Sequence, residues 1–132
     1  MTTTDIFLNP LEEKFYKSGF EYYKELGHID NDILEPLLKL NSIDGLASLY
    51  SCQSHPEKNI NSSYLIIKFS EELTFPITNA IYDIKEKYNL EIEWYNSCYY
   101  NIETSYFIDN VVIIRGGTNY RYFQTLADLI ID

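Results

Sequence analysis

Cysteine and histidine are scarce in this chain, with two of each in 132 residues. Two cysteines do not make a disulfide framework, and a reducing cytosol would keep them as thiols. No apolar run approaches the roughly 20 residues that a membrane-spanning helix needs. The N-terminus, MTTTDIF, has neither the basic nor the apolar segment of a signal peptide. The sequence therefore predicts a cytoplasmic protein with no membrane partner.

Basic residues are also few, since ten Lys and Arg oppose twenty Asp and Glu, giving a net charge of −10. Such a surface repels phosphate backbones, which argues against bulk nucleic acid as a partner. It can instead attract a basic protein. Hydrophobic residues make up 45% of the chain, an ordinary globular proportion. The length predicts one domain over 1–132, with 1–8 as a flexible tail.

The periodicity of apolar residues predicts an α+β fold. Helices are expected at 9–27 and from Asp32, where Glu35 completes a capping box. Leu11, Phe15, Tyr22 and Leu26 form the expected buried face of the first helix. The predicted order then continues with strands 46–52 and 64–69, helix 76–88, strands 90–95 and 106–115, and helix 119–130, with 97–105 as a loop or an irregular strand continuation. This order of strand–strand–helix twice, after two N-terminal helices, favours a single two-layer domain with a mainly antiparallel sheet.

The loop SCQSHPEK, residues 51–58, contains one cysteine and one histidine. Cys52 and His55 have C-x-x-H spacing, which suits a metal, with His28 and Cys98 as the remaining candidate ligands. A structural zinc site usually has two close pairs, and cysteine proteases do not space their dyad this way. We therefore predict no metal, no catalytic residue and no cofactor, with Cys52 as a small buried residue. The predicted ligand contacts in this loop are Ser51, Ser54, His55 and Lys58.

The second candidate segment is RGGTNYR, residues 115–121, which holds both arginines of the protein. Glycines at a strand-to-helix junction let backbone N–H groups form an anion nest, and the helix N-terminus adds its dipole. The alternative is a tight turn whose arginines pair with surface acids. The predicted ligand contacts here are Arg115, Gly116, Gly117, Thr118, Asn119, Tyr120 and Arg121. If both loops leave the same end of the sheet, they line one pocket, and the candidates for stacking on a base are Tyr50, Tyr64, Tyr99, Tyr100 and Tyr120.

The stretch LNSIDGLASLYSCQSHPEK, followed by SSYLIIKF, resembles a pattern in small uncharacterised bacterial and phage proteins whose strand ends in Ser-Cys-x-Gly-His. It is more distantly similar to the wybutosine-synthesis methyltransferase-like family, whose strand ends in Ser-Ser-Cys-Ser-Gly-Arg. That family acts on a modified guanosine in tRNA with S-adenosylmethionine. The likeness covers residues 38–69, with Ser54 where Gly is expected and His55 where the second family has Arg. The resemblance implies a ligand-contacting loop on an α+β scaffold.

Three functions remain open, and binding is favoured over catalysis. The first is a non-catalytic, phage-encoded anti-defence protein that sequesters a small anionic ligand, such as a cyclic nucleotide or an ADP-ribose derivative. The second is an acidic inhibitor that docks on a basic host protein through Glu71, Glu72, Glu91, Glu93 and Tyr95. The third is an enzyme on a nucleotide or modified base that uses Cys52 or His55. The sequence leaves the oligomeric state open, a homo-oligomer included.

Overall fold

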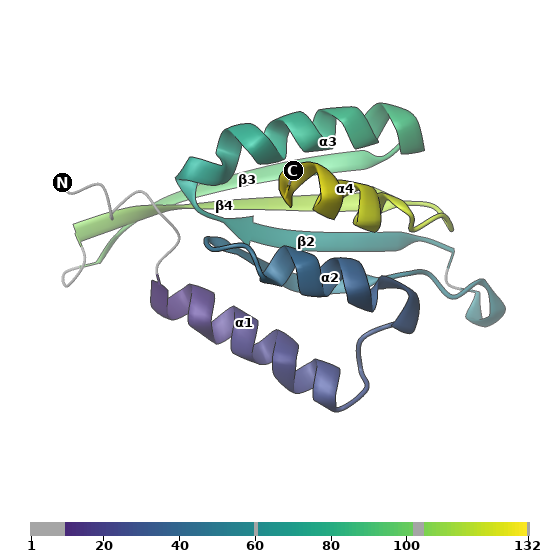
Figure 1. The fold of residues 1–132 in the computed structure, drawn as a ribbon. Coiled ribbons are helices and arrows are strands. Elements are labelled where there is room, and N and C mark those ends of the chain that lie inside the picture. The colour runs from purple at the N-terminus through teal and green to yellow at the C-terminus, as the bar shows by residue number, and fades with distance from the viewer. Residues whose placement is uncertain (1–9, 60, 102–104, 132) are drawn as a thin grey trace.

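In the computed structural model, residues 10–59, 61–101 and 105–131 are described, and they form an α+β fold with four α-helices and a four-stranded sheet (Figure 1). The elements in order are α1 (Pro10–Glu25), η2 (Asn31–Ile33), α2 (Leu34–Asn41), β1 (Leu46–Cys52), η3 (Pro56–Lys58), β2 (Ser63–Phe69), η4 (Glu71–Leu73), α3 (Thr74–Tyr88), β3 (Glu91–Asn101), β4 (Ser105–Gly116) and α4 (Tyr122–Ile131). The predicted fold class is confirmed. No helix in these ranges combines the length and apolar content that a bilayer crossing requires.

The sheet has the order β1-β2-β4-β3, and all neighbouring strands are antiparallel. Side chains on a strand alternate between the two faces of a sheet, and the residues that point to the helix-covered face form the core. Leu65 on β2 pairs with Ile114 on β4, and both side chains are fully buried. Figure 1 shows α2 and α4 lying across this face, with α3 next to β3. The helix α1 contacts β1.

The opposite face of the sheet presents a row of side chains that includes one residue of each candidate loop, Cys52 and Arg115. Cys52, Tyr64, Arg115 and Glu91 are successive Cα partners across β1, β2, β4 and β3. They alternate with buried residues such as Leu65, so they point away from α2 and α4. Farther along the same face Ala47 and Lys68 are buried, so we use the name open face for the exposed end around Tyr50, Tyr64, Arg115 and Glu91.

Several predicted boundaries and contacts are wrong at the level of single residues. Asp32 is not a helix cap, since η2 begins at Asn31 and α2 at Leu34 without a side-chain cap. On α1, Phe20 is buried, whereas Tyr22 and Leu26 are exposed; the side chains of Leu11 and Phe15 lie outside the described part. Strand pairing continues through 97–101 and 105–110, so of the two alternatives for this segment the strand continuation is confirmed for 97–101 and the loop is wrong there. The last helix begins at Tyr122, three residues later than expected.

Candidate functional site

The loops SCQSHPEK and RGGTNYR meet at one end of the sheet. The hydroxyl of Ser54 donates to the carbonyl of Thr118 at 3.3 Å. Beside this contact, the N–H and hydroxyl of Ser63 both donate to the carbonyl of Gly117, at 3.0 and 2.9 Å. These bonds fasten the loop before α4 to β2 and to the end of β1. The two loops therefore touch directly.

A buried side chain of α4 supports this junction from the core. The hydroxyl of Tyr122 donates to Ser63 Oγ at 2.9 Å, and Tyr122 is fully buried. Burial raises the pKa of Tyr122 to about 12, and the hydrogen bond with Ser63 opposes part of this rise. Gly116 fits against the same ring, because a Cβ there would lie 2.8 Å from Tyr122 Cε1 and 3.0 Å from Leu90 Cδ2. The glycine therefore serves close packing.

Two serines predicted as ligand contacts face the protein instead. Ser54 is 5% exposed, has a φ of 79° and uses its hydroxyl on Thr118. Ser51 pairs with Leu65, so its side chain points to the helix-covered face. Lys58, at the end of η3, is exposed. In the second loop Gly116 and Tyr120 are half-buried, and the other predicted contacts are exposed: Arg115, Gly117, Thr118, Asn119 and Arg121.

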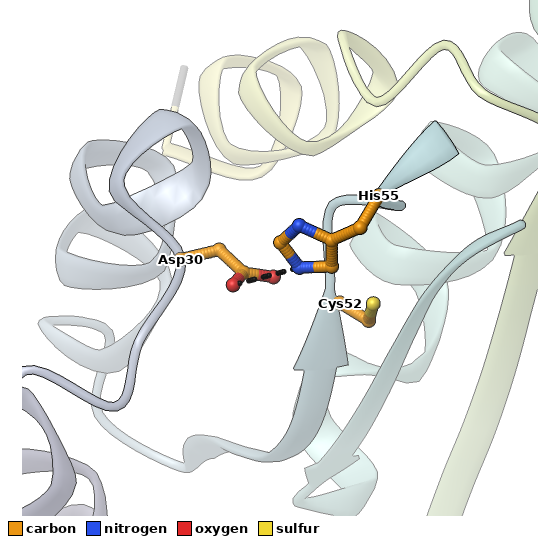
Figure 2. Close-up of side chains that lie close together, drawn as sticks. All are labelled: Asp30, Cys52 and His55. Carbon is orange, nitrogen blue, oxygen red and sulfur yellow. Dashed lines mark hydrogen bonds and ion pairs between the residues drawn. The ribbon is translucent and has the colours of Figure 1, made fainter. Parts of the chain in front are cut away.

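Three side chains with metal-ligand or nucleophilic chemistry gather beside the junction. Figure 2 shows the carboxylate of Asp30 facing the imidazole of His55, with Cys52 on the neighbouring strand end. Asp30 Oδ1 lies 3.1 Å from His55 Nε2, and the thiol, imidazole and carboxylate atoms all lie within 4.8 Å of one another. The other ring nitrogen, Nδ1, lies 3.4 Å from Glu57 Oε1. Cys52 ends β1 as expected, but it is half-buried rather than buried.

Asp30 and Asp32, which the sequence did not single out for the site, tie the α1–α2 connection to both loops. Asp30 Oδ2 accepts the backbone N–H of Gln53 at 2.9 Å. Asp32 Oδ2 accepts from Gln53 Nε2 at 3.2 Å and from the hydroxyl of Tyr120 at 3.0 Å. The bond to Asp32 is the main reason that the pKa of Tyr120 is raised. No local pattern signals these contacts, because they join residues 21 to 88 positions apart.

Arg115 is engaged on the open face by an acid of the neighbouring strand. Its guanidinium pairs with Glu93 on β3. A hydrogen bond from Tyr95 and then the pairing with Arg115 hold the pKa of the Glu93 carboxyl below its usual value. Tyr64, beside Arg115 on β2, has a raised pKa through burial and then through proximity to Cys52 and Asp30. Tyr64 thus borders the cluster, whereas Arg115 is engaged on the side of β3.

The remaining sequence candidates lie elsewhere or outside the described residues. His28 is exposed, and its ring stacks on Tyr23 with centroids 6.1 Å apart. Tyr50 is 69% exposed on the same face as Tyr64. The side chains of Cys98, Tyr99 and Tyr100 are not among those that the structure describes.

The comparisons give a fold relative and no family. No family model and no curated protein matches the chain. A solved structure, the PH1069 protein from Pyrococcus horikoshii, is similar with a TM-score of 0.51 and 13% identity, over 91% of this chain and 92% of that one. At this identity the likeness concerns the fold alone, and it extends to nearly the whole of both chains.

The surroundings of His55 bear on whether Cys52 could act as a nucleophile. A cysteine nucleophile needs a nearby imidazole nitrogen that can take its proton. In His55 both ring nitrogens face carboxylate oxygens, of Asp30 and Glu57. The site therefore places a carboxylate, a thiol and an imidazole next to the exposed loop RGGTNYR.

Proposed function

We propose that this protein is a non-catalytic binding protein that captures a small anionic, nucleotide-derived ligand at the joined loops. The observation that carries the proposal is the contact of the two loops through Ser54–Thr118 and Ser63–Gly117. Through this contact RGGTNYR, which holds both arginines, and SCQSHPEK, which lies beside Tyr64, form one continuous surface. Capture of a ligand without turnover agrees with the arrangement around His55.

The backbone of the second loop supports an anion on its outer side. The carbonyls of Gly117 and Thr118 point toward Ser63 and Ser54. In a trans peptide the N–H of the following residue points the opposite way, so the N–H groups of Thr118 and Asn119 face away from these serines. They lie just before the N-terminus of α4, whose dipole favours negative charge. Phosphate oxygens would bind these groups together with the exposed Arg121.

The neighbouring charges determine where the ligand would lie. Asp30 and Glu57 place carboxylates on the SCQSHPEK side, which disfavours phosphate there, and Asp32 binds the hydroxyl of Tyr120 where the two loops meet. We therefore place the anionic part over Thr118, Asn119 and Arg121, away from Asp32, and the base toward the open face, where Tyr64 and Tyr50 can stack on it. As the biological setting we propose sequestration of a defence signal by a phage protein, which rests on the sequence resemblance.

The proposal is tested with purified protein and three probes: a cyclic dinucleotide, ADP-ribose and S-adenosylmethionine. We expect one of the first two to raise the melting temperature and to be recovered intact by mass spectrometry after heat release. Arg121→Ala should weaken this binding at least about tenfold, because a charge-assisted bond to phosphate is lost. Lys14→Ala, which removes an exposed cation from the first half of α1, is the matched control. Binding that is unchanged in Arg121→Ala, or consumption of the ligand, would contradict the proposal.

A second candidate function uses the open face as a docking surface for a basic protein. It is favoured by Glu91, Glu93 and Tyr95 on β3, which lie at the edge of the sheet with Tyr95 51% exposed. Association with a basic partner should weaken steeply with salt, and Glu91→Lys should abolish it. A pull-down from host lysate at low salt that yields no partner would count against this function.

A further inference from the structure

We propose that Asp30, Cys52 and His55 form a binding site for a single divalent transition metal, with Zn²⁺ as the best-suited ion. The proposal does not depend on the nucleotide ligand. It rests on three different donor types, a thiol, an imidazole and a carboxylate, whose donor atoms lie within 4.8 Å of one another. A thiolate and an imidazole together favour zinc-like ions over Mg²⁺ and Ca²⁺, which prefer oxygen ligands.

The distances are close to those that a tetrahedral ion would impose. Bond lengths of about 2.0–2.3 Å place neighbouring ligand atoms about 3.3–3.7 Å apart. Asp30 Oδ1 and His55 Nε2, at 3.1 Å, are already near this separation. The thiol lies within 4.8 Å of both atoms, and rotation about the χ1 bond of Cys52 can adjust its sulfur while the backbone stays paired with Tyr64. The site therefore requires a side-chain adjustment and no refolding of a loop.

The partners around these ligands are those that orient metal ligands in proteins. A metal-bound histidine usually donates its other ring N–H to a carboxylate or carbonyl. Here Glu57 Oε1 lies 3.4 Å from His55 Nδ1, which leaves Nε2 for the ion. Asp30 Oδ2 accepts the N–H of Gln53, which leaves Oδ1 directed at the cluster. Three protein ligands leave a fourth position of a tetrahedral ion for water or for an exogenous ligand.

Burial and charge also suit an ion. The side chains of His55 and Asp30 are 24% and 22% exposed, so the cluster is shielded yet reachable from solvent. Cys52 binds as a thiolate and gives its proton to solvent, so the ion offsets two negative charges, those of the thiolate and Asp30. The competing role is that of a loop clamp, in which Asp30 serves only to hold His55 and Gln53. Cys52 distinguishes the two roles, because it has no part in the clamp.

The test uses the metal alone, without nucleotide. Co²⁺ added to the reduced, metal-free protein should give a thiolate-to-metal charge-transfer band with a stoichiometry of one, and Zn²⁺ should displace it. The chain offers matched controls, since it has just two cysteines and two histidines. Cys52→Ser should abolish the band and His55→Ala should weaken Co²⁺ binding at least about tenfold, whereas Cys98→Ser and His28→Ala should leave both unchanged.

A second measurement avoids substitution in case a variant fails to fold. In the wild-type protein, Zn²⁺ should slow alkylation of Cys52 at least about tenfold and leave the rate at Cys98 unchanged, as read by peptide mass spectrometry. Absence of the Co²⁺ band together with unprotected Cys52 would overturn the metal site, as would a band that Cys98→Ser removes. The nucleotide experiment has its own readout, so failure of either proposal is recognised separately.

Discussion

The hydrogen-bond chain Tyr122–Ser63–Gly117 predicts a pronounced non-additivity between two substitutions. Tyr122→Phe removes one hydroxyl and leaves Ser63 still donating to Gly117, so we expect a loss of about 1 kcal/mol in the free energy of unfolding. Ser63→Ala leaves the Tyr122 hydroxyl buried without its partner, which costs about 2 kcal/mol. The carbonyl of Gly117 also accepts the backbone N–H of Ser63 at 3.0 Å, and neither substitution removes this N–H.

The double variant removes the orphaned hydroxyl as well, so its loss should be about 1.5–2 kcal/mol rather than the additive 3 kcal/mol. The coupling energy is then about 1 kcal/mol or more. Urea unfolding can be followed through Trp94, the single tryptophan, which contacts Phe69 across the sheet. In thermal unfolding, 1 kcal/mol corresponds to a shift of about 4 °C for a domain of this size.

Two losses that simply add within about 0.3 kcal/mol, the agreement usual for independent sites, would refute the predicted coupling. A larger loss in Tyr122→Phe than in Ser63→Ala would also refute it, because the order of the two losses follows from which variant leaves a buried donor unpaired. An unchanged m-value across the four proteins is the control that the unfolded states are comparable.

Two further predictions concern the same junction. Gly116→Ala should lower the free energy of unfolding by about 1–3 kcal/mol, because the added Cβ would lie 2.8 Å from the ring of Tyr122. Gly117→Ala should lower it by less than about 0.5 kcal/mol, because a Cβ there meets nothing within 4 Å. Equal losses of the two variants in urea unfolding would contradict this difference in packing. Because the pKa of Tyr122 is raised, the folded protein holds the phenol proton more tightly than the unfolded chain does. As the pH rises from about 10 through about 12, the free energy of unfolding of the wild type should therefore fall by about 2–3 kcal/mol more than that of Tyr122→Phe. Parallel stability curves over that range would refute this cause.

Much of the fold could be predicted because the order of apolar and polar residues within each strand is visible in a short stretch of sequence. The run Val111–Ile114 and the alternation around Ile92 depend only on which face each residue occupies, so the sequence reveals them. At Asp32 the local pattern misleads, because a capping-box spacing predicts a role at the start of one helix. Its carboxylate instead bonds Gln53 and Tyr120, because a polar group that folding brings near can compete with a local cap.

Ser54 shows why residue type alone does not identify a ligand contact. Its φ of 79° lies in the region that glycine adopts freely, and glycine is the residue expected there from the sequence resemblance. A serine in this conformation is strained, and its hydroxyl bond to Thr118 offsets part of the cost. The position thus sets the path of the loop and its contact with RGGTNYR.

Long-range contacts also explain why the sequence showed two of the three proposed metal ligands and missed the third. Cys52 and His55 were visible as a C-x-x-H pair, and a second close pair was sought because structural zinc sites usually have one. The third donor is Asp30, 25 positions before His55, in a connection with no metal-binding pattern. A metal site with three protein ligands and an open fourth position needs no second pair of ligands close in sequence. The lack of such a pair therefore argues only against a structural zinc site with four protein ligands.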